Sequence, residues 1–82
     1  SLLEKVDKET AIEILSQIKM PDRESQNNLS SARRVAATIW YWRGKLGTHN
    51  QISSFAEAIT LWKKGLCPNA AATVSELLHR IA

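Results

Sequence analysis

Residues 32–46 read ARRVAATIWYWRGKL and residues 52–66 read ISSFAEAITLWKKGL, so one arrangement of side chains occurs twice, twenty positions apart. Four apolar residues and one cation match: Ala36, Ile39, Trp42, Leu46 and Arg43 recur as Ala56, Ile59, Trp62, Leu66 and Lys63. In each copy the apolar residues fall three, four and seven positions apart, which is the spacing of one helix face. The pattern predicts two adjacent amphipathic helices with one packing plan. An internal duplication and a coincidence would both produce it, because the period is shorter than that of common solenoid repeats.

The chain has 82 residues and three tryptophans, with ordinary apolar content and few glycines and prolines. A domain of this size buries only about 60 to 65% of its unfolded surface, so a few large aromatic residues matter for its core. We therefore predict that residues 1–82 form a single helical interaction domain. The chain lacks an initiating methionine and its last helical pattern runs to the end, so we expect that it is excised from a longer protein.

Helical periodicity and helix-stopping residues predict the fold class. We expect an all-α protein, a compact bundle of four helices at about 8–19, 31–45, 51–64 and 70–81. The short connection at 47–50 implies that 31–64 forms an antiparallel helix hairpin. Residues 21–29 are polar and show no period, which predicts a mobile loop. No segment has the alternating pattern of a strand.

Capping residues suggest where these helices begin and end. Asp7 is the expected N-cap of the first helix, and Ser30 or Ser31 that of the second. Gly44 and Gly47 bracket the end of the second helix, and one of them is expected to adopt the left-handed conformation that often terminates a helix.

A helical wheel places the side chains of the second helix. With Ile39 at the centre of the buried face, the neighbours on that face are Ala32, Val35, Ala36, Trp42 and Leu46; the matching face of the third helix is Ile52, Phe55, Ala56, Ile59, Trp62 and Leu66. Trp40 lies at the boundary, and Tyr41 lies between two cations on the far side. This surface strip predicts partner binding by Arg33, Arg34, Trp40, Tyr41 and Lys45. A solvated, structurally ordinary surface is the alternative interpretation.

Charge is distributed unevenly. Residues 1–24 hold four basic and six acidic side chains, whereas residues 25–82 hold seven basic and two acidic ones, within a net charge of +3. We assign Arg43, Lys63 and Lys64 as candidate anion-binding residues. Each of the three also lies near a helix C-terminus, where a cation is favoured by about 0.3 to 1 kcal/mol without any ligand.

Catalytic and metal-binding patterns are absent from the sequence. His49, Cys67 and His79 are far apart and have no carboxylate at metal-ligand spacing, so we predict no metal site and no cofactor. No phosphate-binding loop or hydrolase motif is present, so we predict that the protein is not an enzyme. A single cysteine allows no internal disulfide, which favours a reducing intracellular compartment, cytoplasmic or nuclear. No apolar stretch is long enough to span a membrane.

Two segments resemble known families. The stretch 46–55 (LGTHNQISSF), with Leu61-Trp62 and the segment 72–78 (ATVSELL), resembles the latter half of death-fold adaptor domains, which implies homotypic assembly. The stretch 59–68 (ITLWKKGLCP), with Leu77-Leu78, is similar to the end of the recognition helix and the following helix in repressor-type helix-turn-helix domains, which implies DNA binding. Neither similarity assigns the chain to a family.

These observations predict a non-catalytic adaptor or regulatory domain that binds another protein, with an acidic surface on that partner as one option. The alternative is a small basic DNA-binding domain of the helix-turn-helix type, which would use Arg33, Arg34, Tyr41, Arg43, Lys45, Lys63 and Lys64. Self-association through Trp40 beside Ala37 is a third option.

Overall fold

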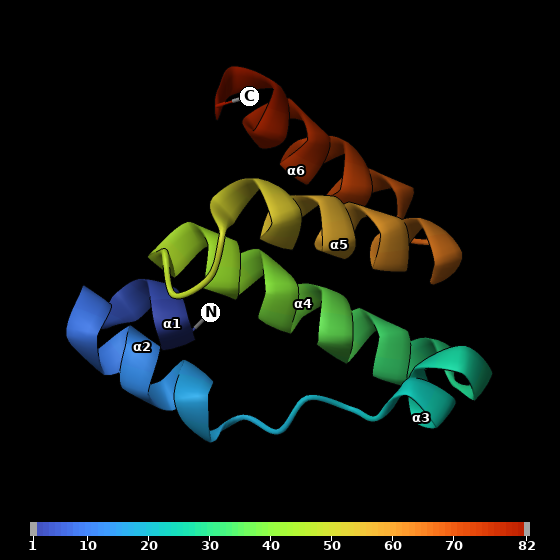
Figure 1. The fold of residues 1–82 in the computed structure, drawn as a ribbon, viewed down its shortest axis with the longest axis horizontal. Helices are drawn as coiled ribbons and strands as arrows, with labels where there is room; N and C mark the ends of the chain where they lie inside the picture. The colour runs from blue at the N-terminus through green and yellow to red at the C-terminus, as the bar shows by residue number, and fades with distance from the viewer. Residues whose placement is uncertain (1, 82) are drawn as a thin grey trace.

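The computed structural model describes residues 2–81, and the regular structure in this range is entirely α-helical. The helices in this range are α1 (Leu2–Lys5), α2 (Lys8–Gln17), α3 (Arg23–Asn28), α4 (Ser30–Leu46), α5 (Gln51–Lys64) and α6 (Pro68–Ile81) (Figure 1). The predicted all-α class is confirmed. The predicted number of helices is wrong, because the short helices α1 and α3 were not expected.

Helix α3 lies within the segment that was predicted to be a loop. Its N-cap is Asp22, whose Oδ1 accepts a hydrogen bond from the backbone N–H of Ser25 at 2.7 Å. Hydrogen bonds from the backbone and the hydroxyl of Ser25 lower the pKa of Asp22. No residue of α3 is buried, so its sequence carries no apolar period from which the helix could have been predicted. Capping, rather than amphipathicity, defines this helix.

Helix N-termini differ in how they are capped. Asp7 caps α2 as predicted, accepting a hydrogen bond from the backbone N–H of Thr10 at 2.8 Å. The N-cap of α4 is Leu29, which makes no side-chain capping hydrogen bond, so neither Ser30 nor Ser31 caps this helix. The prediction there is wrong by one position or more. Asn50 caps α5 through its side-chain oxygen.

Helices α4 and α5 end in the same backbone geometry with different residues. After α4, Gly47 adopts the left-handed conformation at φ 76°, as predicted, and the N–H of Thr48 donates to the carbonyl of Arg43. After α5, the left-handed residue is Leu66 at φ 58°, because Gly65 falls one position too early and has φ −85°. Leucine therefore occupies a position that usually requires glycine.

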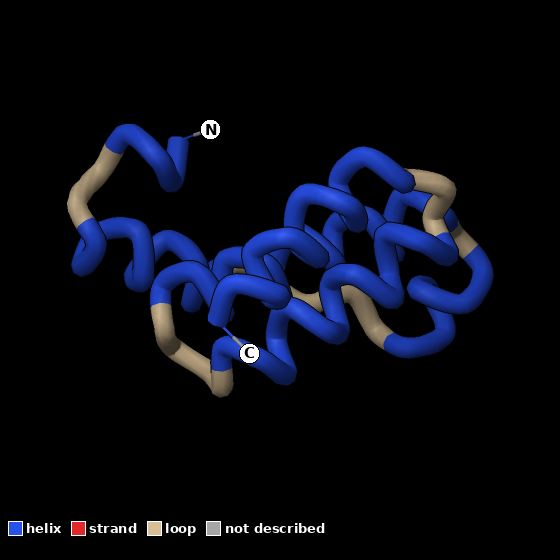
Figure 2. The backbone as a smooth tube through the Cα atoms, turned by 90° about the horizontal axis from the view of Figure 1, so that it is seen from above, coloured by secondary structure: helices blue, strands red, loops and turns tan. Residues whose placement is uncertain are grey.

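The helices stack side by side in the order α6, α5, α4, with α2 and α3 against the remaining side of α4 (Figure 1). α4 and α5 run in opposite directions, and α6 returns along α5. α2 contacts the half of α4 that ends at Leu46, and α3 contacts the half that begins at Ser30. In both views the α3–α4 junction and the α5–α6 turn lie at the same end of the molecule (Figures 1 and 2).

Because α4 lies between α5 and the α2/α3 pair, it has two buried faces rather than one. Ile39 and Trp42 pack against Leu15 of α2, whereas Ala36 and Ala37 pack against Leu61 of α5. A third cluster joins α5 to α6 and contains Phe55, Ile59, Ala71 and Val74. The core is therefore divided among three helix interfaces.

Gly44 allows α4 and α5 to approach closely. A Cβ atom at this position would lie 2.9 Å from ring atoms of Phe55 and 3.2 Å from Cβ of Ser54. Gly44 therefore does not end the helix, which was one of the two predicted roles; it is a buried contact within α4.

Several residues assigned to the buried faces are exposed: Val35, Ile52, Ala56 and Leu66. The wheel assumed one core side for each helix, but the neighbouring helices cover α4 and α5 at other angles and over only part of their length. None of the helices within residues 2–81 combines the length and the apolar character needed to cross a membrane.

Candidate partner-binding pocket

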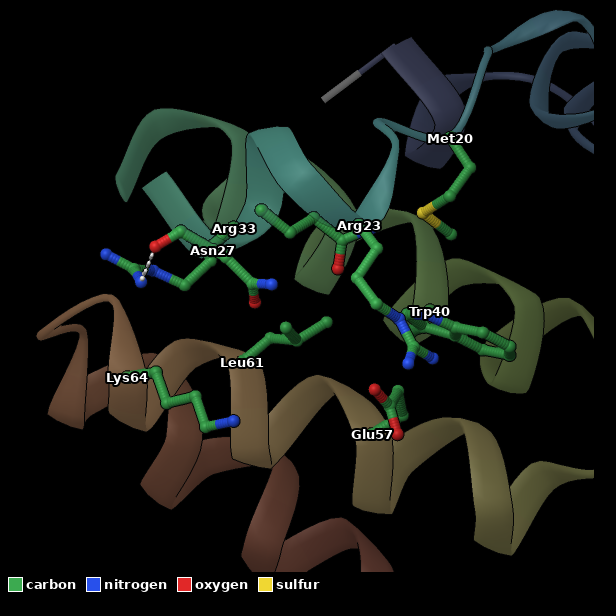
Figure 3. A pocket seen from close by; sticks show the side chains of 9 residues that line it. Met20, Arg23, Asn27, Arg33, Trp40, Glu57, Leu61 and Lys64 are labelled. Carbon is green, nitrogen blue, oxygen red and sulfur yellow. Dashed lines mark hydrogen bonds between the residues drawn. The ribbon is translucent and has the colours of Figure 1, made fainter. Parts of the chain in front are cut away.

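A pocket of about 450 Å³ lies where α3, α4 and α5 meet (Figure 3). Its lining consists of Met20 from the preceding linker, Arg23, Gln26 and Asn27 from α3, Arg33 and Trp40 from α4, and Glu57, Leu61 and Lys64 from α5. Leu61 is buried and forms the apolar part of the wall between the charged groups. Capping of α3 by Asp22 positions the residues that this short helix contributes.

The polar groups are separated along the pocket (Figure 3). The Arg23 guanidinium, the Trp40 indole and the Glu57 carboxylate lie together at one end. Lys64 and Asn27 lie toward the other end, and the Lys64 ammonium points into the opening. An oxyanion entering the pocket would meet the Lys64 ammonium and the Asn27 amide on the side away from the Glu57 carboxylate.

Arg33 has unused hydrogen-bonding capacity. Its Nη1 donates to the backbone carbonyl of Asn27 at a long 3.4 Å. Its Nε is buried and has no hydrogen-bond partner among the described residues. A buried donor without an acceptor costs about 1 to 3 kcal/mol, so a rotation of the Arg33 side chain that brings Nε to an acceptor in the pocket would be favoured. The three cations and one carboxylate of the lining leave a net positive charge for an anionic group.

The structure brings together three of the residues predicted from the sequence. Arg33 and Trp40, predicted to bind a partner, and Lys64, predicted to bind an anion, line this pocket. The sequence reasoning missed Arg23, because the helix that presents it was expected to be a loop. The signal for it was the Pro21-Asp22 pair, in which Asp22 can cap a helix, followed by a short polar segment before the next helix.

Tyr41 is not on the outward strip where the wheel placed it. It is half-buried, and its ring packs against Trp42, Phe55 and Trp62 at centroid distances of 5.4, 5.9 and 5.9 Å. At about 200° from Ile39 it faces α5, the helix that the single-faced wheel did not include. Lys45 remains exposed, with Nζ 5.7 Å from the centroid of the Tyr41 ring.

Arg43 also acts within the fold. Its Cζ lies 4.7 Å from the centroid of a Trp40 ring, and His49 contacts the same indole edge-on at 6.0 Å. A cation over an indole contributes about 0.5 to 1 kcal/mol at an exposed site. This contact, together with the complete burial of Ala37, leaves no apolar Trp40–Ala37 patch for self-association.

The two remaining predicted residues lie outside the pocket. Arg34 lines a separate groove with Ile18, Val35, Thr38 and Ile39. Lys63 is exposed in the last turn of α5. In the described part of the chain, no group of three or more His, Cys, Asp or Glu side chains could hold a metal ion.

Comparison with protein families, with characterised proteins and with solved structures found no match to this chain. The resemblances to death-fold and helix-turn-helix domains therefore rest on their quoted segments alone.

Proposed function

We propose that this domain is a non-catalytic interaction domain that binds an acidic segment of another protein in the pocket between α3, α4 and α5. The observation that carries the proposal is the buried, unpartnered Nε of Arg33 beside a pocket that is also lined by Arg23 and Lys64. Carboxylate groups accept charge-assisted hydrogen bonds from such donors, and Arg can hold them in a fixed geometry. Leu61 and Trp40 supply apolar area for the side chains between the acids.

The alternative of DNA binding is supported less well by this arrangement. The cations proposed for it fall into two groups: Arg33, Arg34, Lys63 and Lys64 lie near the start of α4 and the end of α5, whereas Arg43 and Lys45 lie over aromatic rings near the opposite end of α4. A duplex-binding surface tracks a continuous run of phosphates, and the ring of half-buried Tyr41 is engaged with Trp42, Phe55 and Trp62.

Calorimetric titration with two synthetic peptides tests the proposal. One peptide alternates glutamate with leucine, and the other carries glutamine in place of every glutamate. We expect binding of the glutamate peptide only, weakening as salt is added because the contact is between charges. A double variant, Arg33→Gln with Lys64→Gln, should weaken binding about tenfold or more.

The matched control removes two exposed cations elsewhere, Lys8→Gln with Lys45→Gln, and should change the affinity less than about twofold. Equal losses in both double variants would mean that net charge, not the pocket, attracts the peptide, and the proposal would fail. Tight binding of arbitrary duplex DNA together with no binding of the acidic peptide would favour the alternative.

A further inference from the structure

One end of the molecule combines exposed leucines with cations. At this end α4 begins, α5 finishes and α6 begins (Figures 1 and 2). Among the side chains that the structure describes, the two most exposed large apolar ones lie here, Leu66 at 84% and Leu29 at 56% of full exposure. A Cβ built on Gly65 would lie 3.6 Å from Cγ of Arg34, so the start of α4 and the end of α5 are in contact.

Leu66 has an unfavourable backbone conformation, and its side chain is not packed against the rest of the fold. Its φ of 58° is left-handed, and two hydrogen bonds fix the turn: Leu66 N–H to Lys63 O at 3.3 Å and Cys67 N–H to Trp62 O at 2.8 Å. A leucine in this region is strained, and glycine is the residue that normally relieves the strain. Since Leu66 is almost wholly exposed, the fold gains nothing from its side chain. A use outside the fold accounts for both properties.

The charged residues next to Leu66 in the sequence are all cations. Lys63 and Lys64 precede it, and Arg34 reaches the same turn from α4. No acidic residue occurs in 25–56 or in 58–75, which cover the start of α4 and the start of α6. The first turns of these two helices lack acidic residues, and helix N-termini add partial positive charge. The acids that precede Leu29 most closely in the sequence are Asp22, the N-cap of α3, and Glu24 in its first turn, at the opposite end of that short helix from Leu29.

We propose that this end of the domain docks on an anionic lipid surface, with Leu66 and Leu29 entering the interfacial region and Arg34, Lys63 and Lys64 contacting phosphate headgroups. Charge complementarity supports this occupant, because basic side chains are attracted to anionic leaflets. The form of the surface supports it as well. Protein interfaces centre on packed aromatic anchors, whereas the exposed large apolar residues at this end are single leucines between helices. A fluid interface accepts separate apolar side chains without a matching pocket.

Co-sedimentation with lipid vesicles tests the proposal on the full chain. One set of vesicles contains phosphatidylcholine alone, and the other contains phosphatidylcholine and phosphatidylserine in equal parts. We expect binding to the second set only, and loss of binding as salt is raised. The double variant Lys63→Gln with Lys64→Gln should reduce partitioning by about fivefold per charge.

The decisive variant is Leu66→Gly, which relaxes the turn while removing the apolar side chain. Its thermal midpoint should not fall, yet its partitioning into anionic vesicles should drop about tenfold. The matched control is Ile52→Ala, at the other end of α5. This change also removes apolar surface from an exposed residue, but it should leave partitioning into the vesicles unchanged.

Three results would overturn the proposal: no binding to phosphatidylserine vesicles, equal binding to both vesicle types, or full binding by Leu66→Gly. Duplex DNA that binds the unaltered chain and Leu66→Gly equally, with no vesicle binding, would assign this end to nucleic-acid phosphates instead. Lysine substitutions alone would not separate these two sources of phosphate, and for that reason the leucine variant is essential.

Discussion

Helices α4 and α5 carry matched residues in sequence, yet the matched isoleucines near the middle of the two helices are the pair that is buried in both. Ile39 and Ile59 are both buried, at 3% and 8% exposure. Ala36 is fully buried whereas its counterpart Ala56 is exposed, and Leu46 is half-buried whereas Leu66 is 84% exposed. The neighbours explain the difference: α4 is covered on two sides, and α5 is covered by α4 and α6 over one broad face. Burial therefore depends on the elements that surround a helix, not on its own pattern alone.

The largest expected effect comes from the matched tryptophans. Trp42 is 7% exposed and packs against Leu15 and Ile39, so Trp42→Ala should lower the free energy of unfolding by about 3 to 5 kcal/mol. Trp62 is only half-buried, and Trp62→Ala should cost less. Urea denaturation followed by circular dichroism measures both. Equal losses would show that the two helices are more alike than their burial indicates.

The second-largest difference between the two helices is expected at the matched alanines, Ala36 and Ala56. Ala36 has no exposed surface, so Ala36→Leu should overpack the α4–α5 contact and cost about 1 to 3 kcal/mol. The same change at Ala56 meets solvent and should alter the free energy of unfolding by less than about 0.5 kcal/mol. Denaturation midpoints of the two variants give the comparison. A loss at Ala56 as large as that at Ala36 would contradict the observed stacking order.

Substitutions in the turns that follow the two helices should change the free energy of unfolding in opposite directions. Gly47→Ala places a side chain at φ 76° and should destabilise the domain by about 1 kcal/mol. Leu66→Gly frees a strained leucine and should be neutral or stabilising by up to about 1 kcal/mol. Thermal denaturation of both variants provides the test. A clear loss of stability in Leu66→Gly would mean that this side chain does contribute to the fold.

Acidification should have the smallest effect and should act on α2 and α3 rather than on α4 and α5. Hydrogen bonds from the hydroxyl and the backbone of Thr10 lower the pKa of Asp7, and those from Ser25 lower the pKa of Asp22. A carboxylate with a lowered pKa in the folded state stabilises the fold above its unfolded pKa of about 3.9, and this contribution is lost as the pH falls through the lowered value. Stability measured against pH should therefore decline below about pH 4. An Asp7→Asn, Asp22→Asn double variant should show a smaller decline.

The all-α class and four of the six described helices could be predicted because amphipathic periodicity and capping residues are local properties of the sequence. α3 could not be predicted from periodicity, because it buries nothing. The inward position of Tyr41 depended on knowing that α5 covers the back of α4, which is a tertiary fact. The same limit applied to the pocket: Arg33, Trp40 and Lys64 were identified separately, but their convergence with Arg23 follows from the placement of α3.

The three indoles are distributed among different contacts: Trp42 faces α2, Trp40 lies beside the pocket, and Trp62 lies between the clusters that α5 forms with its two neighbours. Each of these helix contacts therefore contains or adjoins a tryptophan, whose fluorescence depends on that contact. Variants that retain a single tryptophan can report the detachment of α2 separately from that of α6. Time-resolved emission from such variants would reveal whether the domain unfolds in one cooperative step or whether its helix interfaces separate one after another.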